Sequence, residues 1–244
     1  MTVSGPDDRI EARIAGAAPI RAILWDIDGT LMDSEPWHQR AMVEVCRGYG
    51  HDLGDALCAA SVGVAFREFY ARLHAIRPLP VTLDRWADEI NALYVARVAA
   101  VPPRAGAFAL VEAFAARGLP QACVSNSGRM VVDAHLAAME TAMGAAHFRF
   151  GISRDDVAEG KPHPEPYLLA AARLGLPPQA CAVIEDSPTG ARSAVAAGML
   201  TIAWPQHPDL AFDAVDHRVE DPAALDWDAL CGVVLPPHPL VAKK

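Results

Sequence analysis

A short apolar run that ends directly in two aspartates constrains the fold more than any other stretch of the chain. Residues 22–25 read Ala-Ile-Leu-Trp, and Asp26 and Asp28 follow, with Gly29 directly behind them. An apolar run bounded by turn residues predicts a strand buried in a parallel sheet. Side chains two residues apart on a strand share a face, so both carboxylates are predicted to leave the sheet together at its carboxyl end. Ligands bind at that end in open α/β sheets.

Asp26 is the more informative of the two carboxylates. A turn or a helix cap is the ordinary place for an aspartate beside a glycine, and it accounts for Asp28. It does not account for Asp26, which continues the apolar strand, where an unpaired carboxylate is costly unless a cation or hydrogen bonds meet it. The pair suits metal-assisted attack, with one carboxylate as nucleophile and the other as proton donor and acceptor.

A second apolar run, at residues 121–124, ends in small polar residues. It continues into Ser125 and Asn126, followed by a serine and a glycine. Small hydroxyl residues are favoured at helix N-caps, and hydroxyl and backbone N–H groups at a helix start also bind phosphate. The two interpretations are compatible, and the position after a strand favours phosphate binding.

Two later stretches supply a cation and two more carboxylates. Lys161 lies between a glycine and a proline, and three prolines fall within residues 162–166. A single lysine is solvated by default, but these prolines restrict the turn and suit a positioned charge. An apolar run at residues 181–184 ends in Glu185 and Asp186. Adjacent residues of a strand face opposite ways, so both can reach one metal only if the chain turns there.

The rest of the chain alternates between helical and strand patterns, with one long helical exception. From residue 35 to residue 101 the apolar residues recur at helical spacing without a convincing strand, which predicts an inserted helical domain rather than a crossover. Further helices are expected at 106–117, 129–138, 166–174 and 191–197, and further strands at 148–153, 200–204 and, at the edge, 217–219.

Composition narrows the classes of function. The 244 residues are 52% hydrophobic and carry a formal net charge of −9, which predicts a sizeable core and argues against nucleic acid or an anionic membrane as partner. No run is long enough to span a membrane, and no signal-peptide pattern is present. Five scattered cysteines lack metal-ligand spacing and a disulfide framework, which indicates reduced thiols in a cytoplasmic protein.

The polar strings resemble the motifs of the haloacid dehalogenase (HAD) superfamily. DIDGT at residues 26–30, extended by DSEP at residues 33–36, resembles the first motif in the phosphatase and β-phosphoglucomutase-like branch with a helical cap. The strings that contain Ser125, Lys161 and Glu185 follow in the order of the second, third and fourth motifs.

The resemblance covers roughly residues 21–205 and implies an α/β fold. The expected core is a Rossmann-like, doubly wound parallel sheet with an inserted α-helical cap domain. The expected bounds are 18–34 and 102–244 for the core, 35–101 for the cap and 1–17 for an N-terminal extension.

The resemblance also implies a role for each polar group. Mg²⁺ would be held by Asp26, Asp186 and the backbone carbonyl of Asp28, with Glu185 as a direct or water-mediated ligand. Asp26 would attack phosphorus, while Asp28 would protonate the leaving group and then activate water. The other expected site residues are Ser125 and Lys161, which would stabilise the phosphoryl oxygens, and the substrate-binding residues Gly29, Asn126, His38 and Arg67.

The implied function is Mg²⁺-dependent hydrolysis of a small phosphomonoester, such as a sugar or polyol phosphate, through an aspartyl-phosphate. The expected partner is a small phosphorylated metabolite, with no nucleic acid and no membrane. One alternative is a β-phosphoglucomutase-type phosphosugar mutase, and a less favoured one is a non-catalytic phosphate-binding protein. The founding dehalogenases lack the second aspartate of the first motif, so Asp28 argues against dehalogenation.

Two residues of the expected cap bear on the choice between phosphatase and mutase. His38 matches a histidine of the mutases, but many phosphatase relatives share it, and a histidine on a helix surface is an equal alternative. Where mutases carry Gly-Val-Ser-Arg, residues 63–66 read Gly-Val-Ala-Phe, and Arg67 comes one residue late. One residue rotates a helical side chain by roughly 100°, so Arg67 is predicted to miss the distal phosphate, which favours water as the acceptor.

Overall fold

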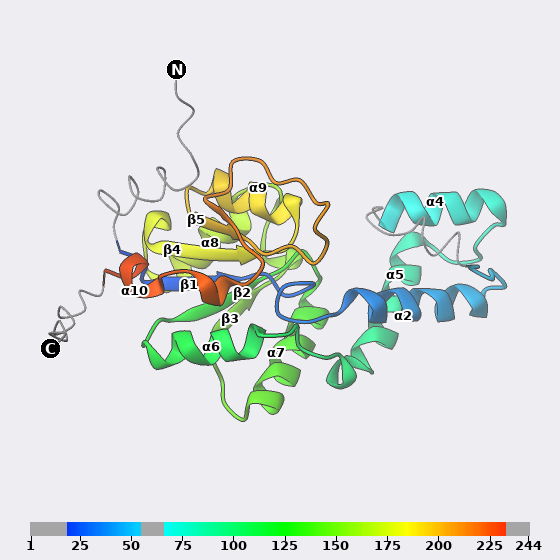
Figure 1. Ribbon diagram of the computed structural model, residues 1–244. Helices are drawn as coiled ribbons and strands as arrows, with labels where there is room; N and C mark the ends of the chain where they lie inside the picture. The colour runs from blue at the N-terminus through cyan, green and yellow to red at the C-terminus, as the bar shows by residue number, and fades with distance from the viewer. Residues whose placement is uncertain (1–18, 55–65, 233–244) are drawn as a thin grey trace, which may run out of the picture.

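A computed structural model describes residues 19–54 and 66–232, which contain a six-stranded parallel sheet (Figure 1). The strand order is β3-β2-β1-β4-β5-β6, so the chain winds in one direction from β1 to β3 and in the other from β4 to β6. This confirms the predicted doubly wound α/β fold. The strands are β1 (Ala22–Trp25), β2 (Gln121–Val124), β3 (Phe148–Ile152), β4 (Cys181–Glu185), β5 (Leu200–Ala203) and β6 (His217–Arg218).

Helices cover both faces of the sheet, with α6 and α7 on one face and α8 and α9 on the other (Figure 1). The helices are α2 (Glu35–Gly48), α4 (Phe66–Ile76), α5 (Leu83–Val95), α6 (Ala107–Ala116), α7 (Arg129–Met143), α8 (Glu165–Leu174), α9 (Pro188–Ala196) and α10 (Trp227–Leu230). Short 3-10 helices are η1 (Val98–Ala100), η2 (Arg154–Asp156), η3 (Pro178–Ala180) and η4 (Pro222–Ala224).

Strand β1 contributes to the core on both faces of the sheet. Ile23 and Trp25 belong to the apolar cluster on the side of α6 and α7. Ala22 and Leu24 belong to the cluster on the side of α8 and α9, together with Tyr167. All four strand residues are fully buried, which explains why the run is continuously apolar instead of alternating.

The central strands end level with one another. Trp25 of β1 pairs with Cys123 of β2 and with Ile184 of β4. Because the three strands are parallel and in this register, the polar residues that follow each of them meet at one edge. That edge lies where the winding direction reverses between β1 and β4, which is the usual ligand site of such a sheet.

Helices α2, α4 and α5 lie beyond this edge of the sheet (Figure 1). Thr82 is the N-cap residue of helix α5, because its hydroxyl accepts a hydrogen bond from the backbone N–H of Arg85 at 3.3 Å. Its buried residues, Trp86, Ile90 and Tyr94, are spaced along one face, and the helix packs against both α2 and α7. The division into core and cap at the predicted bounds stays a prediction.

Two predicted helix bounds are wrong. The helix expected over 129–138 extends to Met143, because buried Met139 continues its apolar face and Gly144, with a φ of 69°, ends it. The helix expected over 191–197 begins at Pro188, since the Ser187 hydroxyl caps it by accepting from the N–H of Gly190 at 3.0 Å. The remaining expected strands and helices agree with the structure within one residue or so at each end.

Some predictions fall on parts of the chain outside the described residues. These are the N-terminal extension at 1–17 and residues 63–65 of the string compared with the mutases. Within the described ranges, no helix is long and apolar enough to cross a membrane. The cysteines described there are free thiols, as expected, and three of them are buried: Cys46, Cys123 and Cys181.

Candidate active site

A cleft of about 1110 Å³ lies between the carboxyl edge of the sheet and the helices beyond it. Asp26 and Lys161 line it on the side of the sheet. On the opposite side the cleft is lined by His38 of α2, Arg67 of α4 and Asn91 of α5. The cleft therefore joins the predicted strand-end motifs to residues of the helical segment.

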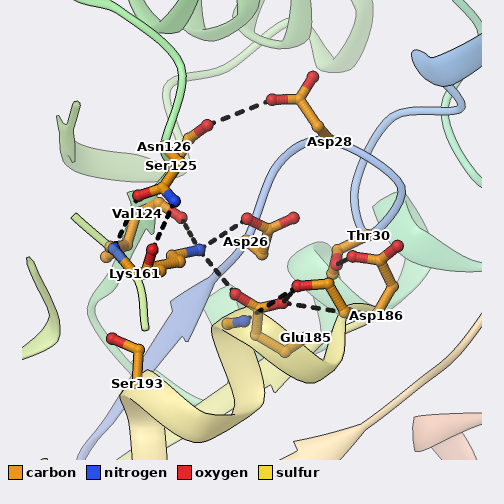
Figure 2. Close-up of polar contacts among 12 residues, drawn as sticks. Asp26, Asp28, Thr30, Val124, Ser125, Asn126, Lys161, Glu185, Asp186 and Ser193 are labelled. Carbon is orange, nitrogen blue, oxygen red and sulfur yellow. Dashed lines mark hydrogen bonds and ion pairs between the residues drawn. The ribbon is translucent and has the colours of Figure 1, made fainter. Parts of the chain in front are cut away.

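The buried ammonium group of Lys161 lies at the centre of the site (Figure 2). Its Nζ donates hydrogen bonds to Asp26 Oδ1 at 2.7 Å, to Glu185 Oε1 at 2.6 Å and to the backbone carbonyl of Val124 at 2.7 Å. All three of its donor hydrogens thus have partners. Burial would lower the pKa of Lys161, but the charges of Asp26 and Glu185 outweigh burial and raise it, which favours the positively charged form.

Asn126 fixes the backbone of Lys161. The Asn126 amide donates to the Lys161 carbonyl at 3.0 Å and accepts from the Lys161 N–H at 2.8 Å. This two-bond clamp joins the turn after β2 to the proline-rich loop. Lys161 is therefore held in a buried position and is not the solvated surface lysine that is the default for a single lysine.

Glu185 has no exposed surface, and its oxygens accept four hydrogen bonds. Besides Lys161, the Tyr167 hydroxyl donates to Oε1 at 2.8 Å, and Ser187 donates to Oε2 through its hydroxyl at 3.0 Å and its N–H at 3.3 Å. Helix α9 approaches so closely that a Cβ at Gly190 would lie 1.7 Å from Glu185 Oε1. Glu185 is thus held by hydrogen bonds to both of its oxygens and by the close packing of α9.

Asp186 is held beside the first motif. Its Oδ1 accepts from the Thr30 hydroxyl at 3.0 Å. Gly29 has a φ of +85°, and a Cβ there would lie 2.3 Å from Asp186 Oδ2. Glycine is required for this close approach and this backbone conformation. Gly29, expected to bind substrate, therefore lies against Asp186.

Three carboxylates form a cluster that could hold a metal ion. One oxygen each from Asp26, Glu185 and Asp186 lies within 4.8 Å of the others. Burial, followed by the charge of Glu185, raises the pKa of Asp26 well above its usual range and that of Asp186 to about 7. Lys161 offsets only one of the three negative charges, so the remaining charge matches a divalent cation, and an all-oxygen donor set suits a hard one.

Asp28 points away from this cluster and has its own set of partners. Its Oδ2 accepts from the Ser127 hydroxyl at 2.9 Å and from the Ser125 hydroxyl at 3.2 Å. Its Oδ1 accepts from the buried Ser34 hydroxyl at 2.8 Å. Two residues apart in sequence, Asp26 and Asp28 therefore lie in different environments, one facing Lys161 and the other facing the hydroxyl groups (Figure 2).

Two histidines approach the same oxygen of Asp28. The Nε2 atoms of His38 and His135 each lie 3.4 Å from Asp28 Oδ1. Burial alone would raise the pKa of Asp28, but hydrogen bonds and charge from His135 and His38 outweigh it and hold this pKa well below its usual range. In the absence of substrate Asp28 is thus a carboxylate.

His38 does not lie on an open helix surface. Its ring stacks on Tyr94 with a centroid distance of 3.6 Å and an interplanar angle of 9°. Its contact with Asp28 and its position on the cleft agree with the expected place in the site. The alternative of a plain surface histidine is excluded by these contacts.

Arg67, expected among the substrate-binding residues, lies at the cleft, and its predicted failure to reach a distal phosphate stays a prediction. Arg67 lines the same cleft as Asp26 and Lys161. It is the second residue of α4, so its long side chain extends from the first turn of the helix.

Several residues around Asp28 were not predicted. The most prominent is His135, which is fully buried on α7 among Val131, Val132 and Met139. A histidine in the apolar face of a helix is a signal that the sequence does carry, because buried polar groups need partners. Tyr94 is another, because it lies on the buried face of α5 and its hydroxyl lies 2.9 Å from His135 Nε2.

Comparison with known proteins adds a family and several relatives. A family model described as haloacid dehalogenase-like hydrolase matches residues 20–198. Hexitol phosphatase A of Escherichia coli (strain K12) is 33% identical over 186 residues, which cover 75% of this chain and 82% of that protein. Fructose-1-phosphate phosphatase YqaB of the same organism is 31% identical over 183 residues, which cover 72% of this chain and 92% of that protein.

A solved structure shares both the fold and part of the sequence. A crystal structure of a variant of CbbY from Rhodobacter sphaeroides in complex with xylulose 1,5-bisphosphate superposes with a TM-score of 0.71 at 26% identity. The match covers 85% of this chain and 96% of that one.

The packing of α9 on Glu185 predicts that Gly190→Ala destabilises the protein. The added methyl group would displace the Glu185 carboxylate from Lys161 and Tyr167, so unfolding in urea should show a loss of about 1–3 kcal/mol. Gly48→Ala is the matched control, because a Cβ there meets nothing within 4 Å, and it should be neutral or stabilising by up to about 1 kcal/mol. Equal stability of Gly190→Ala and the wild type would contradict the packing described.

Proposed function

The chain belongs to the haloacid dehalogenase-like hydrolases, and on that premise we propose that it is a Mg²⁺-dependent phosphatase that acts on a small sugar or polyol phosphate. The observation that carries the proposal is the buried Lys161, which joins Asp26 to Glu185 beside Asp28 at one end of the cleft. This combination supplies a nucleophile, a fixed positive charge and a proton carrier at one point.

The first half-reaction forms an aspartyl-phosphate. Lys161 holds Asp26 through Oδ1, and Asp26 attacks phosphorus with its other oxygen while the bond from phosphorus to the ester oxygen breaks. The leaving alkoxide takes the proton of Asp28, which gives a neutral alcohol. Ser125 donates a hydrogen bond to a phosphoryl oxygen, and the positive charge of Lys161, whose hydrogens stay on Asp26, Glu185 and Val124, stabilises the charge of the phosphoryl group.

The second half-reaction releases phosphate. Asp28, now a carboxylate again, takes a proton from water as the water oxygen attacks phosphorus. The bond between phosphorus and the Asp26 oxygen breaks, which regenerates the Asp26 carboxylate and releases inorganic phosphate.

Asp28 must bind a proton before it can act as an acid. Its low pKa in the free protein follows from hydrogen bonds that include those from the two histidines. When a phosphoryl group takes the hydroxyl donors of Ser125 and Ser127 and brings its own negative charge, Asp28 loses two hydrogen bonds to Oδ2 and gains an anionic neighbour. Both changes favour the protonated carboxyl group.

The carboxylate cluster would hold Mg²⁺ through Asp26, Asp186 and the backbone carbonyl of Asp28. We assign Glu185 a water-mediated contact, because Lys161, Tyr167 and Ser187 already donate to its oxygens. When bound, the ion supplies positive charge that polarises the phosphoryl group.

The substrate class follows from the side of the cleft opposite the sheet. There the polar side chains of Arg67, Asp84 and Asn91 offer hydrogen-bond partners for hydroxyl groups. The relatives named for hexitol phosphates and fructose 1-phosphate support a polyhydroxylated phosphate ester. We propose that these residues belong to a cap that selects the organic part of the substrate.

A phosphosugar mutase is the second candidate, because Arg67 lines the cleft and could bind a second phosphate. Incubation with β-glucose 1-phosphate, Mg²⁺ and a trace of the bisphosphate distinguishes the two. We expect free phosphate to form faster than glucose 6-phosphate, with Asp26→Asn as the inactive control. Glucose 6-phosphate forming much faster than free phosphate would overturn the phosphatase proposal.

We expect a hard divalent cation to be required for activity and to stabilise the fold. After removal of metal with a chelator, activity should be lost, and Mg²⁺ should restore it while Ca²⁺ binds and inhibits. Mg²⁺ at about 100 times its Kd should raise the free energy of unfolding by about 2.7 kcal/mol. Asp186→Asn should lose most of this stabilisation. Full activity of the chelated protein would contradict the metal requirement.

A further inference from the structure

Burial of the His135 side chain costs free energy, because one of its polar atoms has no hydrogen-bond partner among the described residues. Its ring has no exposed surface, and within the described residues its Nδ1 has no hydrogen-bond partner. A buried N–H without a partner is rarer in proteins than a buried acceptor without one. The ring proton is therefore assigned to Nε2, which lies 2.9 Å from the Tyr94 hydroxyl and 3.4 Å from Asp28 Oδ1. The N–H of His135 thus lies between two oxygens, that of the Tyr94 hydroxyl at the shorter distance and Oδ1 of Asp28 at the longer one.

The environment of His135 is assembled from three helices. Tyr94 of α5 lies between His38 of α2, on which it stacks, and His135 of α7, whose ring centroid is 5.6 Å away at 50°. The contact between α5 and α7 therefore brings Tyr94 and His135 together. His135 is fixed by packing on α7, whereas Asp28 follows β1 in a turn.

The two oxygens of Asp28 have different partners. Oδ1 faces Ser34, His38 and His135. Oδ2 faces Ser125 and Ser127, the hydroxyl groups that line the cleft after β2. If Oδ1 is held in this way, Oδ2 is the oxygen presented to a phosphoryl group bound at Ser125.

We propose that His135 is a positioning residue for Asp28, an inference that rests on the proposed phosphatase function. Its buried Nε2–H holds Oδ1, so that Oδ2 is the oxygen that gives its proton to the leaving alkoxide and later takes one from water. His135 touches neither the substrate nor the phosphoryl group. It acts by fixing the orientation of the carboxyl group.

A pair of substrates tests this role, because only a poor leaving group needs the acid. Glycerol 3-phosphate releases a strongly basic alkoxide, whereas p-nitrophenyl phosphate releases a stable phenolate. His135→Leu should therefore lower the first-turnover rate on glycerol 3-phosphate at least about tenfold more than that on p-nitrophenyl phosphate. On the aryl substrate it should also produce a burst of nitrophenolate, because Asp28 is still needed to activate water in the second step.

Two further variants separate positioning from structure. His135→Gln carries an amide N–H near the place of Nε2 and should recover most of the alkyl-phosphate rate, whereas the shorter His135→Asn should not. His51→Leu is the matched control, since His51 is also buried with an unpaired Nε2 among the described residues but does not line the cleft. It should change both rates by the same factor. Thermal melting of each variant reports whether it folds, and His135→Asn replaces His135→Leu if the latter does not.

These measurements distinguish a failure of the phosphatase function from a failure of the positioning role of His135. If the wild type hydrolyses neither substrate nor any phosphorylated polyol, the phosphatase function fails. If the wild type is active and folded His135 variants lose both rates by one common factor, or lose neither, the positioning role is overturned while the function stands. A selective loss on glycerol 3-phosphate that His135→Gln reverses supports the role.

Discussion

The site depends on one buried ammonium group between two buried carboxylates. Removing charges from water is expensive, and Lys161 can be buried only because Asp26, Glu185 and the Val124 carbonyl accept all its hydrogens. Two further features keep these groups together. Asn126 forms two hydrogen bonds with the backbone of Lys161. Gly190, near the start of α9, has no side chain and therefore leaves room for the Glu185 carboxylate. The negative charge that remains on the carboxylates is the charge that a bound divalent cation would neutralise.

The same strand end gives two aspartates opposite properties. Burial and neighbouring carboxylates raise the pKa of Asp26, whereas His135 and His38 overcome burial and lower that of Asp28. Two titratable groups whose environments push their pKa values apart are suited to two different roles. Here the difference agrees with the proposed roles. Asp26, the proposed nucleophile, would be deprotonated more readily beside a bound cation. Asp28, the proposed proton carrier, would bind a proton when the substrate takes its hydrogen-bond donors. A spacing of two residues would by itself predict similar surroundings.

Much of the fold and the strand-end residues could be predicted from the sequence, because parallel strands bring their carboxyl ends to one edge. Asp26, Ser125, Lys161 and Glu185 follow or join such ends, so local patterns were sufficient to bring them together. His135 and Tyr94 could not be assigned to the site, since their meeting depends on how α5 packs against α7, which no local pattern encodes.

The role of Asp26 can be measured most directly by trapping the phosphoryl group on the chain. The wild-type protein, mixed with a phosphorylated polyol and Mg²⁺ and quenched in acid within one turnover, should carry phosphate on the peptide that contains Asp26. Asp26→Asn, which keeps the shape of the side chain, should carry none. Phosphate found on another residue, or a full turnover of free phosphate with no labelled peptide at any time, would contradict nucleophilic attack by Asp26.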